Sequence, residues 1–237
     1  MKMSEIKVKD KEISVPGEVL AVGMDVLPGA GTYREGEKIV ANRLGLVMMD
    51  GRTIKLLPLS GRYMPKTNDT IICKVIDVGF NGWRLDTNSA YSAMLSMKDA
   101  TSEFIQRGAN LTQYYDLGDH IVCQIVNVTS QKLIDVTMKG PGLRKLKGGR
   151  IIEVDANKVP RIIGKQGSMV VMIKEATQCN IVVGQNGLIW IDGGPMNELL
   201  AIQAIRKISA ESHTTGLTDK IKGFLEQNSV PKKTHQD

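Results

Sequence analysis

The sequence predicts a multidomain chain that is mostly β, with an α+β unit toward its C-terminal end. Three observations indicate this class: short strand-like runs broken by glycine and proline, a repeated strand motif, and a helix-rich segment after the repeat. We expect a small N-terminal β domain over 1–60, an OB-type barrel over 61–143 and a βααββα unit over 144–216. Residues 217–237 are expected to form a short amphipathic helix and a frayed tail.

The first 60 residues show no helical periodicity. They contain strand-like runs such as ISVPGEVLAVG and KIVANRLGLVMMDGRTIKLLPL. Asp50-Gly51 separates two apolar runs, and these residue types accept the positive φ angles of a tight turn. The pattern therefore predicts a small β domain with a hairpin at Asp50-Gly51.

The barrel prediction depends on a local repeat. DTIICKVIDV (69–78) matches DHIVCQIVNV (119–128), with aspartate, isoleucine, cysteine and valine in register. With GWRLDT between the copies and KLIDVTMKG after them, five strands with one long, partly helical connection fit an OB-type barrel better than a sandwich. We expect Cys73 and Cys123 to be small buried strand residues; a redox pair is the weaker alternative.

The C-terminal unit follows the order strand, helix, helix, strand, strand, helix. Its segments are GRIIEVD, ANKVPRII, SMVVMIKEATQ, CNIVVG, GLIWIDG and PMNELLAIQAIRKISAES. Pro195 suits the first turn of the last helix, where its missing N–H costs nothing. The threefold spacing of Leu199, Ile202, Ile205 and Ile208 predicts that this helix packs on the sheet.

Positive charge is concentrated in one window of the chain. Between positions 139 and 177 there are nine basic and three acidic residues, so this window holds the whole net charge of +6. A solvated basic loop is one explanation; a surface that binds a polyanion is better supported. The candidate contacts are Arg144, Lys145, Lys147, Arg150, Lys158 and Arg161.

The segment VPRIIGKQGSMV, 159–170, places a glycine loop inside this basic window. Gly164, Lys165, Gln166 and Gly167 link two predicted helices, so the loop lies at the positive end of the second helix, where an anion is favoured. Glycines without β-carbons let a sugar-phosphate backbone approach the main chain, and Lys165 adds a positive charge. Ser168 is expected to be the N-cap of the second helix, and with these four loop residues it is a candidate contact for the bound anion. A simple turn is the alternative.

VPRIIGKQGSMVVMIKEATQCNI resembles the KH RNA-binding domain, in which a G-x-x-G loop clamps single-stranded nucleic acid beside an apolar groove. The resemblance implies that Ile162, Ile163, Val170 and Ile173 line or support that groove. Val171 and Met172 depart from the pattern, because exposed basic residues are common there. The second helix is thus apolar nearly all round, which suggests cover by another domain or subunit; ordinary core packing is the alternative.

The middle unit is similar to the OB-fold RNA-binding repeats of the large bacterial ribosomal small-subunit protein. NDTIICKVIDV, GWRLD, GDHIVCQIVNV and LIDVTMKG occur in the expected order, whereas the usual G-L-x-H-x-S segment is only faintly kept in SAMLSMKD. The resemblance makes Phe80, Trp83, Arg84 and Tyr91 candidate RNA contacts. Trp83 and Trp190 are each more typical of core than of contact residues.

Nearly the whole chain resembles the KH-bearing RNA-binding cap subunits of the archaeal exosome, from VPGEVL and GAGTYREGEKIVANRLGLV to NGLIWIDG. The resemblance implies a non-catalytic cytoplasmic subunit, three to a hexameric ring of phosphorolytic 3'-5' exoribonuclease subunits. It would dock through its N-terminal domain and guide single-stranded RNA with poly(A)-type tails into the ring. The other cap type carries a zinc ribbon, which three scattered cysteines and three histidines do not support.

The sequence gives little support to two other functional classes. A nuclease needs clustered carboxylates or a phosphate-binding catalytic centre; Asp116 and Asp119 are close together but lie in an ordinary turn context. A transcription or translation factor would be favoured by a second KH domain or a helical N-terminal domain. We therefore expect no catalytic residue, metal or cofactor, and the charged N-terminus and lack of a long apolar run predict a soluble protein without membrane association.

Overall fold

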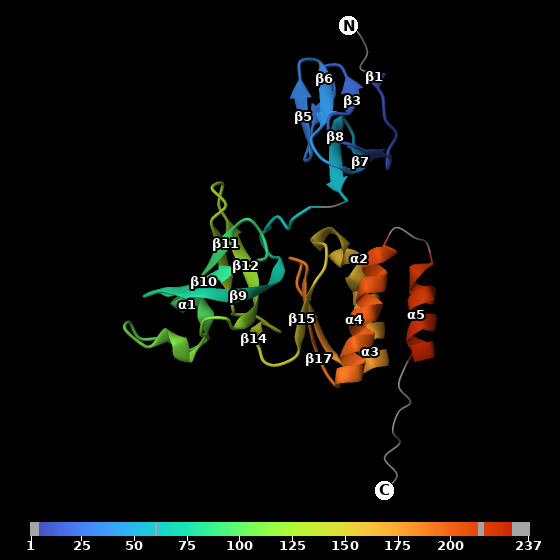
Figure 1. Ribbon diagram of the computed structural model, residues 1–237. Helices are drawn as coiled ribbons and strands as arrows, with labels where there is room; N and C mark the ends of the chain where they lie inside the picture. Colours follow the sequence, from blue (N-terminus) through green and yellow to red (C-terminus); the bar gives the residue numbers. More distant parts are fainter. Residues whose placement is uncertain (1–4, 60, 213–215, 229–237) are drawn as a thin grey trace. The chain divides into compact units, whose positions relative to one another are not determined.

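The computed structural model describes residues 5–59, 61–212 and 216–228. The chain divides into two compact units, Met1–Gly61 and Arg62–Asp237 (Figure 1). Residues 229–237, which include the predicted tail, lie outside the described residues, as do residues 1–4 and 60 of the predicted β domain.

Two four-stranded sheets form the N-terminal unit, in the orders β1-β3-β6-β5 and β2-β7-β8-β4. Buried side chains from both sheets, among them Leu20, Ile39, Val47 and Ile54, make one apolar core. Within residues 5–59 the structure contains strands but no helix, as predicted. The strands are β1 Glu5–Ile6, β2 Ile13–Ser14, β3 Val19–Val22, β4 Leu27–Pro28, β5 Thr32–Glu35, β6 Lys38–Ala41, β7 Gly45–Asp50 and β8 Thr53–Pro58.

The predicted hairpin joins β7 to β8. Asp50 pairs with Thr53, so Gly51 and Arg52 form the two-residue turn. Gly51 has a φ of 58°, the left-handed conformation that such turns require. The hairpin prediction is confirmed, with the turn one residue later than Asp50-Gly51.

The second unit begins with a closed five-stranded barrel. The barrel strands follow the order β13-β11-β10-β9-β12, and β13 also pairs with β12, which closes the barrel. A sixth strand, β14, extends the sheet by pairing with the start of β12. A short helix, α1 Met97–Ala100, and a 3₁₀ turn, Leu111–Gln113, occupy the long connection between β11 and β12. The strands are β9 Thr70–Val78, β10 Gly82–Asp86, β11 Ser92–Ser96, β12 His120–Val128, β13 Ile134–Thr137 and β14 Arg144–Leu146.

The repeated motif forms β9 and β12, which lie side by side. Cys73 and Cys123 are fully buried in the barrel core, and their Sγ atoms are 3.5 Å apart. Burial raises the pKa of the Cys73 thiol and so disfavours the reactive thiolate. Each copy also has a β-bulge at the same repeat position, Ile76 in β9 and Val126 in β12, where the pairing register shifts.

A βααββα module follows the barrel, in the predicted order. Its antiparallel sheet has the order β15-β17-β16. The elements are β15 Arg150–Glu153, α2 Val159–Ile163, α3 Ser168–Thr177, β16 Asn180–Val183, β17 Leu188–Asp192 and α4 Pro195–Ala210, with 3₁₀ turns at Ala156–Lys158 and Lys165–Gly167. A further helix, α5 Leu217–Asn228, contacts α3 and α4.

The module's sheet is covered on both faces, by the helices on one and by the barrel on the other (Figure 1). Alternate residues of β17 explain this: Ile189 and Ile191 join the helix core, whereas Leu188 and Trp190 pack against barrel residues such as Ile72. A strand that is buried on both faces is a continuous apolar run. Trp190 is only 5% exposed, which agrees with its prediction as a core residue.

One residue of the predicted apolar face of α4 is exposed. Ile202, Ile205 and Ile208 are buried, but Leu199 is 43% exposed. Leu200 and Ala201 are buried instead, because the buried stripe of a helix with 3.6 residues per turn drifts away from strict threefold spacing.

Candidate nucleic-acid interface

The glycine loop between α2 and α3 has left-handed backbone at three positions. The φ angles are 76° at Gly164, 53° at Gln166 and 81° at Gly167. The Gly167 amide donates to the Gly164 carbonyl at 3.3 Å. Glycine adopts this backbone readily and glutamine seldom does, so Gln166 is held in an uncommon conformation between the two glycines.

The two glycines of the loop have different physical roles. A β-carbon on Gly164 would lie 2.7 Å from Cβ and 2.8 Å from N of Met169, so any side chain there would collide with the start of α3. A β-carbon on Gly167 would meet nothing within 4 Å. Gly164 is therefore required for the packing of the loop itself, whereas the surface over Gly167 is open to a ligand.

Ser168 is the first residue of α3, and Gly167 occupies the cap position. The prediction of Ser168 as N-cap is wrong, because the chain enters the helix through a left-handed glycine and not through an extended polar residue. In the described structure no side chain caps this helix. The Ser168 amide donates to the Lys165 carbonyl, so the start of α3 attracts an anion next to Gly167 mainly through the positive end of its dipole.

Some side chains around the loop are buried in the core of the domain, and others are exposed at its surface. Ile162 and Ile173 are fully buried and support the fold, while Ile163 and Val170 are partly exposed and could line a groove. Lys165 and Arg161 are exposed, and Lys158 is partly buried.

The expected cover over the second helix is partly supplied by this chain. Met172 packs against the buried cluster to which α5 contributes Leu217, Ile221 and Leu225. Val171 remains 46% exposed. Helix α5, which the sequence predicted only as a short amphipathic element, thus covers part of the apolar surface of α3.

The remaining predicted cations lie where the barrel meets the module, and two of them are in ion pairs. Lys145 pairs with Asp119, and Arg150 Nε lies 2.8 Å from Oε2 of the buried Glu198. The Arg144 guanidinium stacks over the Trp190 ring at 5.7 Å from its centroid. Lys147 is exposed. Lys145 and Arg150 therefore have structural partners, which leaves Arg144 and Lys147 as the better anion contacts.

Asp119, which lies close to Asp116 in the sequence, has a structural role. Its Oδ2 accepts from the Asp116 amide at 2.7 Å and from Lys145. Burial tends to raise the pKa of Asp119, but these hydrogen bonds and the Lys145 charge lower it on balance. An ionised carboxylate that caps a turn and pairs with lysine is poorly suited to general acid-base catalysis.

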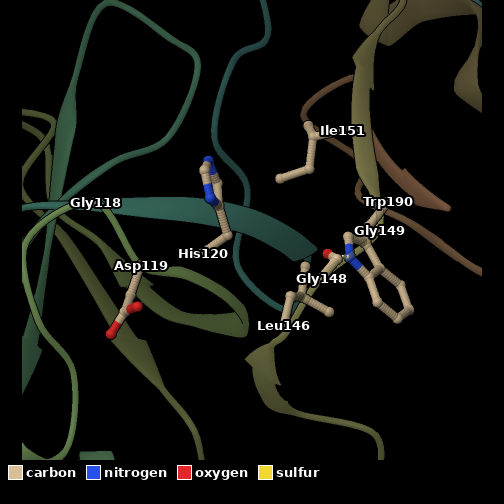
Figure 2. Close-up of a pocket in the computed structure, with 8 residues that line it drawn as sticks. All are labelled: Gly118, Asp119, His120, Leu146, Gly148, Gly149, Ile151 and Trp190. Carbon is tan, nitrogen blue, oxygen red and sulfur yellow. Dashed lines mark hydrogen bonds between the residues drawn. The ribbon is translucent and has the colours of Figure 1, made fainter. Parts of the chain in front are cut away.

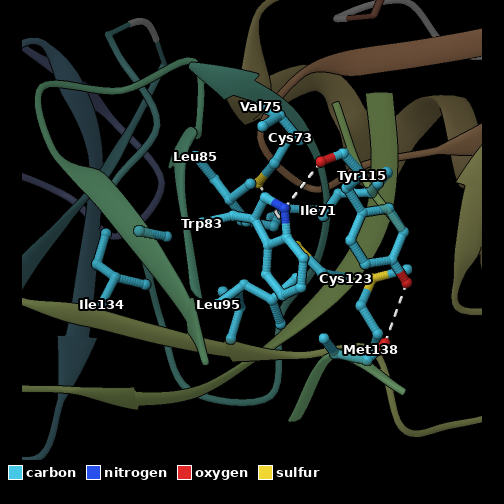
Figure 3. Close-up of a cluster of buried hydrophobic side chains, with 14 of the residues drawn as sticks. Ile71, Cys73, Val75, Trp83, Leu85, Leu95, Tyr115, Cys123, Ile134 and Met138 are labelled. Atoms are coloured by element: carbon cyan, nitrogen blue, oxygen red, sulfur yellow. Dashed lines mark hydrogen bonds between the residues drawn. The ribbon is translucent and has the colours of Figure 1, made fainter. Parts of the chain in front are cut away.

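The four predicted RNA contacts of the barrel differ in their exposure to solvent. Phe80 is 94% exposed and Arg84 is exposed, so both can reach RNA, whereas Tyr91 is partly buried against the barrel core. Trp83 is fully buried: its Nε1 donates to the Tyr115 carbonyl at 2.8 Å, and the two rings meet edge to face at 5.2 Å (Figure 3). The prediction of Trp83 as an RNA contact is therefore wrong.

Sequence reasoning missed Phe104, which is 88% exposed in the connection after α1. Its neighbour Ile105 is buried in the barrel core, so the backbone at this position is anchored while the phenylalanine faces solvent. The segment looks like a polar loop in sequence, and nothing in its pattern distinguishes the two apolar residues.

Among residues 5–59, 61–212 and 216–228, no group of three or more His, Cys, Asp or Glu side chains is placed to hold a metal ion. None of the helices in this part of the chain is long and apolar enough to cross a membrane.

Comparison with known families gives two matches in the second unit. A model described as "RRP4, S1 domain" matches residues 62–127, and a "KH domain" model matches residues 149–196. The first match covers most of the barrel and the second most of the βααββα module; these are hereafter the S1 barrel and the KH domain.

Relatives in archaea extend the likeness over almost the whole chain. "Exosome complex component Rrp4" of Pyrococcus furiosus is 44% identical over 94% of this chain and 86% of its own length. The protein of the same name from Methanothermus fervidus is 42% identical over 92% of this chain and 96% of its own. A crystal structure described as an exosome complex RNA-binding protein aligns with a TM-score of 0.64, at 32% identity, over 71% of this chain and 97% of its own. The chain thus belongs to the Rrp4 family of exosome components, with RNA-binding S1 and KH domains.

Proposed function

We propose that this chain is a non-catalytic cap subunit that holds single-stranded RNA by its backbone and guides it into a phosphorolytic exoribonuclease ring. The observation that carries the proposal is the open surface over Gly167, next to the uncapped start of α3 and the exposed Lys165. This arrangement offers main-chain amides and positive charge but no base-specific pocket, so it suits backbone contacts.

The S1 barrel adds a second RNA contact in this proposal. Phe80 offers an exposed ring on which a base can stack, and Arg84 a nearby charge. A stacking contact accepts any base, so the barrel and the loop together favour binding with little sequence preference. Poly(A)-type tails are the proposed substrate by family resemblance.

The partners follow from the family. Proteins named exosome complex component Rrp4 are the relatives of this chain, and the proposed assembly is three cap subunits on a hexameric ring, docked through the N-terminal β domain, in the cytoplasm. The two matched family models are both RNA-binding domains, which supports a binding role and leaves catalysis to the ring.

The proposal is tested by Gly167→Asp, with Gly167→Asn as a matched control. The two side chains have the same shape and tolerate left-handed backbone better than most, but only aspartate adds a negative charge at the proposed phosphate site. We expect the aspartate variant to bind oligo(A) RNA at least tenfold more weakly than the asparagine variant. This difference corresponds to about 1.4 kcal/mol of binding free energy. Equal affinities would refute the loop as the RNA site.

A further inference from the structure

A cavity of about 300 Å³ lies at the junction between the S1 barrel and the KH domain. It is distinct from both the glycine loop and the Phe80 surface. Figure 2 shows the residues that line the cavity. His120 and Ile151 lie on opposite sides of it, and the Trp190 ring lies at the end away from His120. The lining residues are Gly118, Asp119, His120, Leu146, Gly148, Gly149, Ile151 and Trp190.

We propose that this junction cavity holds one nucleotide of a bound RNA, with the base beside His120 and the phosphate toward Arg144 and Lys147. The inference rests on the proposed function, because it takes RNA as the ligand, and it adds a site between the two domains. A volume of about 300 Å³ is at the lower end for small-molecule pockets, which suits a single nucleotide.

His120 supplies hydrogen-bonding groups that the protein leaves unused. Its side chain is partly buried at the start of β12 and makes no hydrogen bond to any described residue. Burial and the nearby Lys74 lower its pKa, against the opposing effect of Asp119. A neutral imidazole has one donor and one acceptor, which is the complement that the edge of a nucleobase requires.

Bare backbone forms part of the cavity wall. A β-carbon on Gly118 or Gly148 would meet nothing within 4 Å, as at Gly167. Trp190 is fixed beside them, because its Nε1 donates to the Gly148 carbonyl at 2.8 Å. The cavity therefore combines accessible main chain with a ring held in place.

The charges at the junction favour an anion. Asp119 is the carboxylate that lines the cavity, and Lys145 neutralises it. Arg144, Lys147 and Lys74 are exposed and make no ion pair with any described residue. Arg144 and Lys147 lie on the edge strand β14 and directly after it, while Lys74 is paired with His120 across the strands. A phosphate group would complement these three cations.

Photo-crosslinking of the full-length protein tests the site directly. The probe is an RNA of about 20 nucleotides carrying 4-thiouridine, longer than the roughly 4–16 nucleotides that one OB-fold covers. We expect peptide fragmentation to locate adducts at His120 or within residues 148–151, in addition to the GKQG loop. Adducts at the loop and none at the junction would overturn the proposal.

Variants provide the second measurement. His120→Ala should weaken RNA binding about threefold to tenfold, the effect of one lost hydrogen bond, and His120→Gln should restore part of it. Ile151→Trp, which fills the cavity, should weaken binding and abolish the junction adducts. Met196→Trp, at an exposed apolar position on α4, is the matched control and should change neither.

The outcomes separate this proposal from the proposed function. If the wild-type protein binds RNA and Gly167→Asp weakens it, but the folded His120 and Ile151 variants bind like wild type, only the junction site is refuted. If the wild-type protein does not bind RNA, the proposed function fails with it. Thermal unfolding identifies any variant that is not folded. If Ile151→Trp does not fold, the RNA affinity of His120→Gln and the positions of the crosslinks test the junction site instead.

Discussion

Asn186, in the turn between β16 and β17 of the KH domain, bonds the main chain of Ile72 in the S1 barrel. Its Nδ2 donates to the Ile72 carbonyl at 2.7 Å, and its Oδ1 accepts from the Ile72 amide at 3.3 Å. Nδ2 also donates to the Thr87 carbonyl at 2.8 Å, and Asn186 is 1% exposed. One buried side chain thus satisfies three main-chain groups of the neighbouring domain.

Asn186→Ala should destabilise the chain by about 2–4 kcal/mol, because it leaves buried polar groups of Ile72 and Thr87 without partners. Denaturant unfolding, followed by hydrogen exchange at β9, measures the loss. Gln185→Ala is the control: Gln185 uses its main-chain amide, which donates to the Thr70 carbonyl, and its side chain is exposed. We expect it to cost less than about 0.5 kcal/mol; equal losses would contradict the role of the Asn186 side chain.

Substitutions at Phe80 and Trp83 should have different effects, the first on RNA affinity and the second on stability. Phe80→Ala removes an almost fully exposed ring, so it should weaken RNA binding by about 1–3 kcal/mol with unchanged unfolding. Trp83→Phe removes a buried hydrogen bond to Tyr115 and part of a packed ring, so it should lower stability by about 1–3 kcal/mol. The folded Trp83 variant should bind RNA with the wild-type affinity. A loss of RNA affinity without a loss of stability would show that Trp83 contacts the RNA.

Salt dependence should distinguish the exposed from the paired lysines. If the protein's cations neutralise about four phosphates of the RNA, the logarithm of affinity falls with the logarithm of salt concentration at a slope of roughly −3. Lys165→Ala should reduce the magnitude of this slope by about 0.7. Lys145→Ala should change it less, because Lys145 already pairs with Asp119. Similar changes for both variants would show that the ion pair opens on binding.

The Asp119–Lys145 pair should contribute to stability above acidic pH. The pKa of Asp119 is lowered in the folded chain, so the unfolded chain binds the proton more tightly. The contribution is therefore complete above the unfolded pKa of about 4 and is lost as pH falls through the folded value. Because both side chains are partly exposed, we expect no more than about 1 kcal/mol. Asp119→Asn should be less stable than wild type at pH 7, and the difference should shrink below pH about 4.

The sequence predicted the fold well where local patterns determine it. The repeat placed β9 and β12, Asp50-Gly51 located the hairpin, and the order of apolar runs specified the βααββα module. The glycine loop was predicted as an element, but its two glycines could be told apart only when the contact between Gly164 and Met169 was visible.

The less predictable features depend on contacts between distant residues. Whether Trp83 faces solvent or core is decided by Tyr115, which is 32 residues away. Lys145 and Arg150 pair with Asp119 and Glu198, which are 26 and 48 residues away in the sequence and are not indicated by any spacing. The junction cavity is lined by segments from both domains, so no single sequence motif could indicate it.

The bond between Asn186 and Ile72 also bears on avidity. Two RNA sites joined by a flexible linker would give the second binding event an effective concentration that falls with linker length. Here buried hydrogen bonds join the domains that carry the two proposed sites, so little orientational freedom is lost when one RNA occupies both. Long RNA should consequently be retained far more strongly than fragments that reach only one of the two proposed sites.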